Sequence, residues 1–112
     1  MRAIVQRAYG TCEALRLEDI DEPTPGPHDV LVRVRAASVN RADWFLTTGR
    51  PYILRAGLGL RGPRVPVRGR DLAGTVTAVG GAVTDFGPGD EVYAETTTGS
   101  FAEYACVPER LL

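Results

Sequence analysis

Residues 30–37 read Val30-Leu31-Val32-Arg33-Val34-Arg35-Ala36-Ala37, and they carry the clearest structural signal in the chain. Apolar residues occupy every second position from Val30 to Ala36, while the positions between them hold leucine, two arginines and alanine. Successive side chains of an extended strand point to opposite faces, and β-branched residues pack well on such a surface. The alternation therefore predicts a β-strand with one face toward a core.

Shorter segments of similar character surround this strand. The chain has 13 glycines and 8 prolines, which favours short strands joined by turns. Leu15 and Leu17 alternate with charged residues and predict a half-buried strand, and Gly74 marks a bulge or a close backbone approach. Further strands are expected over 3–8, 72–79, 91–94 and 101–107, with a tight turn over 86–90. The expected fold class is mainly β, in the form of a small barrel.

The period changes after the first strand, and the sequence there predicts one short helix. Asn40 can cap its N-terminus, Asp43 stands at the third helical position, and Gly49 provides a left-handed stop. The helix is therefore expected from Arg41 to about Thr48. Pro108 can open another helical turn after the last strand.

Residues 50–68 are expected to form a long irregular loop, and such a loop in a compact domain is usually functional or mobile. It contains Gly57-Leu58-Gly59-Leu60-Arg61-Gly62, which matches the dinucleotide-binding fingerprint letter for letter. That fingerprint needs a helix to begin there, but Pro66 would break the helix and no βαβ unit fits. A flexible glycine loop is the better interpretation. Four arginines of the loop are expected to be solvated: Arg55, Arg61, Arg64 and Arg68.

The bulk composition is that of a soluble protein of one domain. The 112 residues suit one modest core, and the net charge of −1 gives no field that attracts nucleic acid or an anionic membrane. No apolar run reaches the roughly 18 residues of a membrane span, and the N-terminus lacks a signal-peptide pattern. A cytoplasmic location is therefore expected. Cys12 and Cys106 are expected to be free thiols, with Cys106 filling the core.

Five blocks of the sequence resemble the medium-chain dehydrogenase/reductase family. They read Pro25-Gly26-Pro27, Ala37-Ser38-Val39-Asn40-Arg41-Ala42-Asp43, Gly69-Arg70-Asp71-Leu72-Ala73-Gly74-Thr75-Val76-Thr77-Ala78-Val79-Gly80, Phe86-Gly87-Pro88-Gly89-Asp90-Glu91-Val92-Tyr93 and Gly99-Ser100-Phe101-Ala102-Glu103-Tyr104. Each block alone is weak, but together they span essentially the whole chain in family order and at family spacing. The chain resembles the N-terminal GroES-like catalytic domain of a quinone-oxidoreductase-type member.

The resemblance implies a partly open GroES-like β-barrel over residues 1–112, with the family's Rossmann nucleotide-binding domain absent from this chain. It implies an enzyme that reduces a quinone, an enone or another carbonyl substrate by hydride transfer from NADPH, which the missing domain mainly holds. The isolated chain is then expected to be inactive and to self-associate through the apolar surface that normally meets that domain.

The same resemblance places the candidate site residues. The expected catalytic residues are Asn40, Tyr52 and Arg70. Asn40 would bond the nicotinamide ribose or the substrate oxygen, and Tyr52 would donate a proton or a hydrogen bond. Arg70 would orient Asp71 or anchor a substrate carbonyl. Substrate and cofactor contacts are expected from Asn40, Asp43, Phe45 and Asp71.

Each of these residues also has a purely structural interpretation. Asn40 can serve only as a helix cap, Asp43 only as a favourable charge in the first helical turn, and Phe45 only as packing. Arg70 can form an ion pair that holds the start of the strand over 72–79.

Zinc divides this family. Zinc-dependent alcohol dehydrogenases carry ligands where this chain has Asn40 and Arg70, and neither residue is a plausible ligand, so no metal is expected. Two other classes stay open: a stand-alone, non-enzymatic β-barrel that binds a partner, and a relative of the zinc-type alcohol dehydrogenases that has lost its metal.

Overall fold

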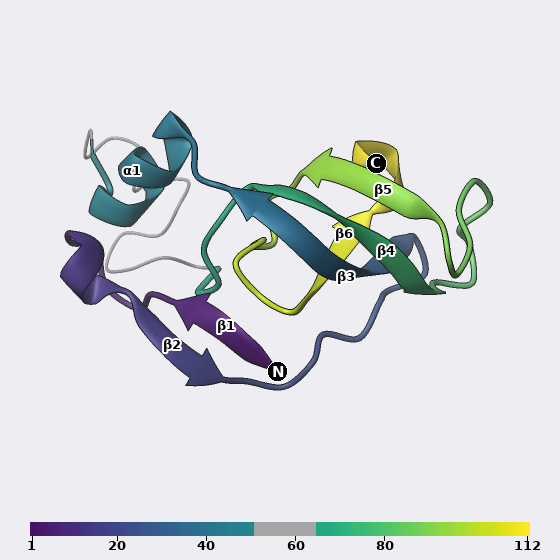
Figure 1. Cartoon of the computed structure of the whole chain (residues 1–112), viewed down its shortest axis with the longest axis horizontal. Coiled ribbons are helices and arrows are strands. Elements are labelled where there is room, and N and C mark those ends of the chain that lie inside the picture. Colours follow the sequence, from purple (N-terminus) through teal and green to yellow (C-terminus); the bar gives the residue numbers. More distant parts are fainter. Residues whose placement is uncertain (51–64) are drawn as a thin grey trace.

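The computed structural model describes residues 1–50 and 65–112, and these residues are mainly β (Figure 1). The strands are β1 (Arg2–Val5), β2 (Arg16–Asp19), β3 (Asp29–Ser38), β4 (Asp71–Val79), β5 (Glu91–Glu95) and β6 (Tyr104–Pro108). The described helical segments are α1 (Arg41–Thr48) and the short 3-10 turns η1 (Cys12–Ala14) and η3 (Glu109–Leu111). Within the described ranges the strands form two antiparallel sheets, β1-β2 and β5-β4-β3-β6, which do not close into one ring. The prediction of a mainly β, partly open barrel with one short helix is confirmed.

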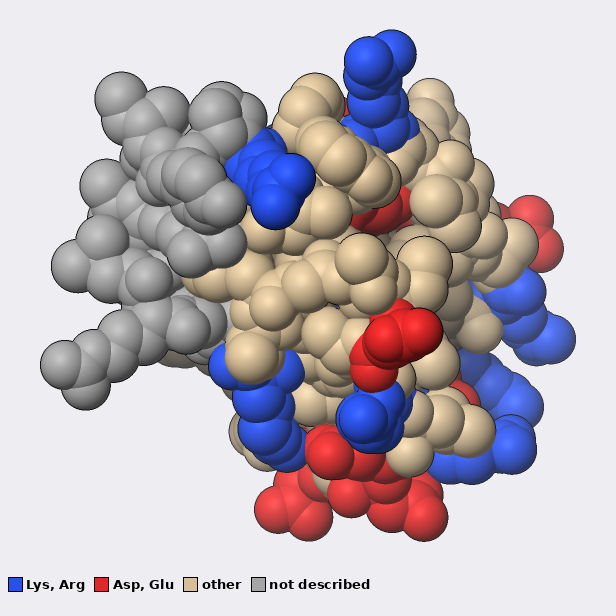
Figure 2. Space-filling view, turned by 90° about the vertical axis from the view of Figure 1, so that its left-hand side faces the viewer, with Lys and Arg blue, Asp and Glu red and all other residues tan. Residues whose placement is uncertain are grey.

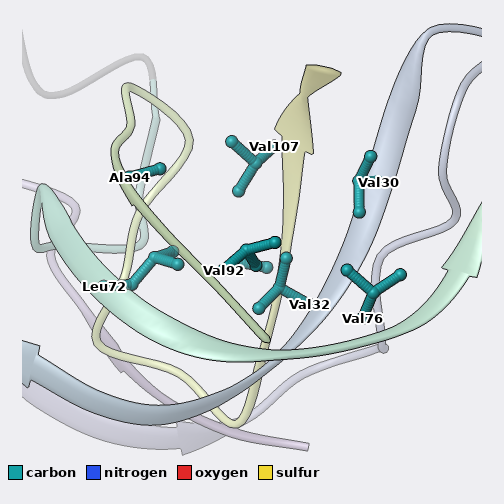
Figure 3. Close-up of a cluster of buried hydrophobic side chains, with 8 residues drawn as sticks. Val30, Val32, Leu72, Val76, Val92, Ala94 and Val107 are labelled. Atoms are coloured by element: carbon teal, nitrogen blue, oxygen red, sulfur yellow. The ribbon is translucent and has the colours of Figure 1, made fainter. Parts of the chain in front are cut away.

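The larger sheet is built around β3, which pairs with β4 on one side and with β6 on the other. Val30 and Val32 are fully buried and Arg33 and Arg35 are exposed, as the sequence pattern predicts, but Leu31 between the valines is also buried and Ala36 is exposed. Side chains from all four strands meet on the inner face (Figure 3): Val30, Val32, Leu72, Val76, Val92, Ala94, Ala105 and Val107. Burying one valine side chain contributes about 1.5 kcal/mol or more, so this cluster holds β3 and β4 firmly in register.

β1 belongs to the smaller sheet and also bonds to the segments that flank β4 and β6 of the larger one. These segments are far apart in sequence: the Ile4 amide donates to the Phe101 carbonyl at 2.8 Å, and the Arg68 amide donates to the Ile4 carbonyl at 3.0 Å. Isolated bridges at Ala3 and Val5 extend these contacts. Since residue 68 leads directly into β4, β1 sets where that strand begins.

Gly74 in β4 shows the close backbone approach that the sequence predicts. A Cβ at this position would lie 2.2 Å from the carbonyl oxygen of Arg33 and 2.8 Å from a methyl of Val32. Its partner in β3 is Val34, and the register between the two strands shifts immediately after that residue. Glycine is therefore required where the two strands come together beside the irregularity.

Three strand predictions need correction. Leu17 is 66 % exposed, so β2 is a surface strand and not the half-buried strand that the leucines indicate. β1 ends at Val5 because Gln6 turns away, its amide donating to the Pro66 carbonyl at 2.8 Å. β6 begins at Tyr104 and not at residue 101, because the Phe101 amide donates at 2.8 Å to the carbonyl of Arg68 instead of joining the larger sheet.

The helix prediction is confirmed at both ends. α1 runs from Arg41 to Thr48, with Asn40 as its N-cap and Gly49 as its C-cap at φ 64°. Pro108 precedes only the single 3-10 turn η3. None of the helices in the described ranges has the length and apolar character that crossing a membrane requires.

Candidate active site

The N-terminus of α1 holds Asn40 in one fixed orientation. Its side-chain Oδ1 accepts the Ala42 amide at 2.8 Å, and its own backbone amide donates to Oδ2 of Asp43 at 2.8 Å. This reciprocal arrangement is a capping box, which satisfies two amide groups that a helix start otherwise leaves without acceptors. Asn40 is thus a helix cap, as its structural interpretation predicts, and its side chain makes a further hydrogen bond as well.

The amide nitrogen of Asn40 faces the start of β4. Because Oδ1 must accept the Ala42 amide, Nδ2 points the other way and donates to Oδ2 of Asp71 at 2.5 Å. The hydroxyl of Ser38 lies 3.4 Å from the same carboxylate oxygen. An asparagine amide carries two N–H groups, and no residue in the described ranges accepts the second one. The site therefore presents one oriented hydrogen-bond donor, backed by a carboxylate.

Asp43 is almost fully buried, with 8 % of its surface exposed. One carboxylate oxygen closes the capping box, while Oδ1 is buried without a hydrogen-bond partner in the described part of the chain. The Asp43 carboxylate acts electrostatically on Arg68. Burial lowers the pKa of Arg68, and the charges of Tyr9 and Asp43 oppose that shift. Asp43 thus belongs to an electrostatic network that passes beneath the helix.

Arg68 corrects a sequence expectation. It was expected to be solvated with the other arginines of its loop, but only 8 % of it is exposed. Its guanidinium donates to the carbonyl of Leu46 at 3.4 Å and to that of Val65. A charge that leaves water needs such acceptors, and the last turn of α1 supplies one of them.

Arg70 forms an ion pair at the beginning of β4, which is the structural interpretation that the sequence allowed. Its Nη2 lies 2.9 Å from Oε1 of Glu95, and its side chain is 29 % exposed. Asp71, which Arg70 was expected to orient, is held by Asn40 and Ser38 instead. The Nε of Arg70 is buried with no acceptor among the described residues, and Arg70 directly precedes Asp71 in the chain.

Phe45 lies on α1, half buried, with its ring 5.2 Å from that of Trp44 at an interplanar angle of 78°. Trp44 itself is 55 % exposed. Tyr52, together with the glycine-rich segment 57–62 and three of the loop arginines, lies outside the described residues. The structure therefore brings Asn40, Asp43 and Asp71 together. Arg70 directly precedes Asp71 in the chain, but its guanidinium pairs with Glu95.

The surface around α1 carries both signs of charge. Figure 2 views the end of the molecule that carries α1: basic and acidic side chains both appear on it, and most of the acidic ones gather toward the bottom of the view. In the described ranges, no three His, Cys, Asp or Glu side chains lie together as a metal-binding group. Cys12 and Cys106 are free thiols, and burial raises the pKa of Cys106 to about 11, which keeps it protonated.

A family model described as the alcohol dehydrogenase GroES-like domain matches residues 26–112. The chain belongs to this family. Among curated proteins, this GroES-like domain is 40 % identical over 108 residues to a quinone oxidoreductase of Lama guanicoe, which covers 94 % of the chain and 30 % of that protein. It is 36 % identical to a chloroplastic quinone-oxidoreductase homolog of Spinacia oleracea, over 99 % of the chain and 33 % of that protein. The chain spans about a third of the length of these relatives.

Solved structures give the same placement for this GroES-like domain. The human synaptic vesicle membrane protein VAT-1 homolog-like protein superposes with a TM-score of 0.85 at 29 % identity, over 99 % of this chain and 34 % of that one. The quinone oxidoreductase of Escherichia coli complexed with NADPH has the same fold, with a TM-score of 0.82 at 21 % identity over 96 % of this chain and 31 % of that one. The recognition of a quinone-oxidoreductase-like domain of the medium-chain dehydrogenases/reductases is confirmed, and its relatives are oxidoreductases.

Sequence reasoning missed three residues that shape this site. Glu95, which pairs with Arg70, follows an alternating strand and has no local signature. Gln6 is 1 % exposed and bonds to α1, and its only signal was a polar residue inside an apolar segment. Arg68 was recognised only as one of several loop arginines. In each case the partner lies far away in sequence, and a local pattern cannot reveal it.

Proposed function

We propose that this GroES-like domain is the substrate-binding part of an NADPH-dependent oxidoreductase that reduces quinone, enone or carbonyl compounds without zinc. The quinone oxidoreductases among its relatives support the reaction class. The NADPH in the Escherichia coli structure makes that cofactor the first to test. The observation that carries the proposal is the oriented amide of Asn40, which Asp71 and the helix cap hold with one N–H free among the described residues.

The chemistry requires a donor where negative charge develops. When NADPH is bound, it supplies a hydride, and the substrate oxygen then gains negative charge. Donors that are already oriented stabilise such an oxygen without having to reorganise. The second N–H of Asn40 is the described donor that fits this task, while Arg70 would first have to turn its guanidinium away from Glu95 to anchor a substrate carbonyl. The same N–H also fits a hydroxyl or carbonyl oxygen of the nicotinamide riboside.

The neighbouring residues hold or surround this donor. Asp71 fixes the Asn40 amide through its carboxylate, and Asp43 fixes the backbone of the same residue. We propose that Phe45 forms an apolar wall for the substrate and that Tyr52 or water delivers the proton that completes the reduction. Zinc has no role in this proposal because Asn40 and Arg70 are engaged with carboxylates and are poor ligands for it.

The test is turnover in the complete enzyme that contains this domain, followed as oxidation of NADPH by a simple quinone and by an enone. We expect Asn40→Ala to lower kcat by about a hundredfold to a thousandfold, the range seen when one oxyanion donor is removed. Arg7→Met is the matched control, because it removes an exposed ion pair with Glu18 far from Asn40 in sequence. Equal loss in both variants, or full activity of Asn40→Ala, contradicts the assignment of Asn40.

Two further expectations belong to this proposal. These 112 residues alone should show no turnover, because they span only about a third of the length of the quinone oxidoreductases that they match. The chain should also self-associate through exposed apolar side chains, of which the described residues include Leu17, Val39, Trp44, Val65 and Tyr93. Turnover by the isolated chain, or a strictly monomeric chain at high concentration in analytical ultracentrifugation, would each count against the respective expectation.

A further inference from the structure

The position of Asn40 depends on what holds α1, because a helix of eight residues is too short to be stable by itself. The carbonyl groups at the C-terminal end of a helix have no N–H donors within the helix. In this chain they are met from outside by two buried polar side chains, Gln6 at the end of β1 and Arg68 before β4. Figure 1 shows α1 at one end of the long axis, beyond the end of β3 that leads into it.

Gln6 holds the C-terminal turn of α1. It is 1 % exposed, and its Nε2 donates to the carbonyl of Thr47 at 2.6 Å and to that of Ala8 at 2.8 Å. The amide of Gly10 donates to the same Thr47 carbonyl at 3.0 Å. The last turn is thereby tied to the segment that follows β1.

Arg68 holds the same side of the helix and carries a charge. Its Nη1 donates to the carbonyl of Leu46 at 3.4 Å, and a cation near the C-terminal end of a helix is favoured by the helix dipole. Asp43, Leu46 and Thr47 follow the i, i+3, i+4 spacing and share one side of α1. Arg68 thus bonds to the last turn of α1, and the Asp43 charge in the first turn acts on it.

Both members of this buried pair have an unused atom. The Nε of Arg68 and the Oδ1 of Asp43 are each buried without a hydrogen-bond partner in the described ranges. A buried charge without compensation is costly, and the Asp43 charge acts on Arg68 to offset part of the cost of burying the guanidinium. The other oxygen of Asp43 holds the Asn40 backbone, and the Asn40 amide holds Asp71.

We propose that Arg68, assisted by Gln6, is a positioning residue that sets the orientation of the Asn40 amide relative to Asp71. It acts through Asp43 and through the last turn of α1, and it touches neither the substrate nor the cofactor. The consequence for catalysis rests on the proposed function, but the geometric claim does not.

The experiment uses the 112-residue chain labelled with nitrogen-15 and compares Arg68→Met with Arg68→Lys. Arg2→Met is the control, since it removes an arginine of an exposed ion pair with Glu103, outside the segment that bonds to α1. The readouts are the side-chain amide signals of Asn40 and the hydrogen-exchange rates of the Asn40 and Ala42 backbone amides. Signals from β3 and β4 report whether the sheet is intact.

For Arg68→Met we expect an intact sheet, Asn40 side-chain signals displaced toward those of a free amide, and about tenfold faster exchange at Asn40 and Ala42. Arg68→Lys keeps the charge but replaces the planar guanidinium fork with a single ammonium group on a flexible stem, so it should show a smaller displacement in the same direction. The control should leave all of these signals unchanged.

The proposal is overturned if Asn40 keeps its wild-type signals in folded Arg68→Met, even when that variant is less stable. If Arg68→Met does not fold, Arg68→Lys decides, and unchanged Asn40 signals there overturn it equally. These readouts are independent of turnover. Displaced Asn40 signals in a domain whose complete enzyme reduces no quinone would uphold the positioning role and contradict the proposed function.

Discussion

Replacing Asn40 with alanine tests the junction between α1 and β4 most directly. The change removes the acceptor for the Ala42 amide, and loss of an N-cap side chain costs about 1 kcal/mol. It also removes the donor to Asp71, and a hydrogen bond to a charged group contributes about 1.5–3 kcal/mol. Both residues are partly exposed, which favours the lower part of that range. We expect the free energy of unfolding to fall by about 2–3 kcal/mol.

Urea titration of the chain, followed by circular dichroism, measures this loss. With a slope of about 1.5 kcal/mol per molar urea, the midpoint should fall by about 1.3–2 M. Asn40→Asp is the matched variant, because it keeps a capping oxygen but sets a second carboxylate against Asp71, and it should restore only part of the loss. Asp71→Asn retains an acceptor and should cost less than Asn40→Ala. A loss below about 0.5 kcal/mol for Asn40→Ala, the level of an ordinary surface change, would refute the bond network.

Other outcomes follow from single residues of the fold. Gly74→Ala places a methyl group 2.2 Å from a backbone carbonyl of β3, so it should destabilise the chain by about 1–3 kcal/mol in the same titration, and an unchanged midpoint would disprove the close approach. Cys12 is exposed, whereas burial raises the pKa of Cys106 to about 11; iodoacetamide at pH 8 should therefore modify Cys12 first, as mass spectrometry of timed samples can show, and equal rates would contradict the burial. Glu109 accepts backbone amides of the 84–85 turn, which lower its carboxyl pKa. Because the pKa of Glu109 is lower in the folded chain, these bonds stabilise the fold at pH values above the ordinary glutamate pKa, and this stabilisation is lost as the pH falls through the folded pKa. The amide signals of Thr84 and Asp85 should therefore shift in acid, and Glu109→Gln should abolish that titration.

Local patterns were sufficient for the elements whose residues interact with near neighbours. The α1 boundaries follow from Asn40 and Gly49, because capping and left-handed termination involve only a few adjacent residues. The burial of Val30 and Val32 follows from a period of two on a strand that is covered on one face. The close backbone approach at Gly74 was also predictable, because a residue without a side chain interrupts a segment that otherwise suits a strand.

Long-range pairing was out of reach of the same patterns. Leu17 obeys a strand alternation yet is exposed, because nothing in a local repeat says whether another layer covers that face. Arg70 and Asp71 were both singled out, but their true partners are Glu95 and Asn40. Arg68 looked like a solvated loop arginine until the carbonyl groups of α1 and the charge of Asp43 were placed beside it. The residues that meet at the N-terminus of α1 could thus be named from the sequence, while their bonding could not, and their roles in catalysis stay predictions.

The central place of β3 in its sheet has a consequence for how the protein is made. β3 ends at Ser38, but the strand on one of its sides is β6, which begins only at Tyr104. Ribosomes add about 5–20 residues per second, so for several seconds one long edge of β3 waits uncovered while the intervening chain is synthesised. Its first half is apolar and would attract the unfinished chains of neighbouring ribosomes, whereas Arg33 and Arg35 give its second half repelling charges during that interval. Arg33, at the end of the stretch that pairs with β6, and Arg35 just beyond it are therefore expected to limit such pairing until β6 is made.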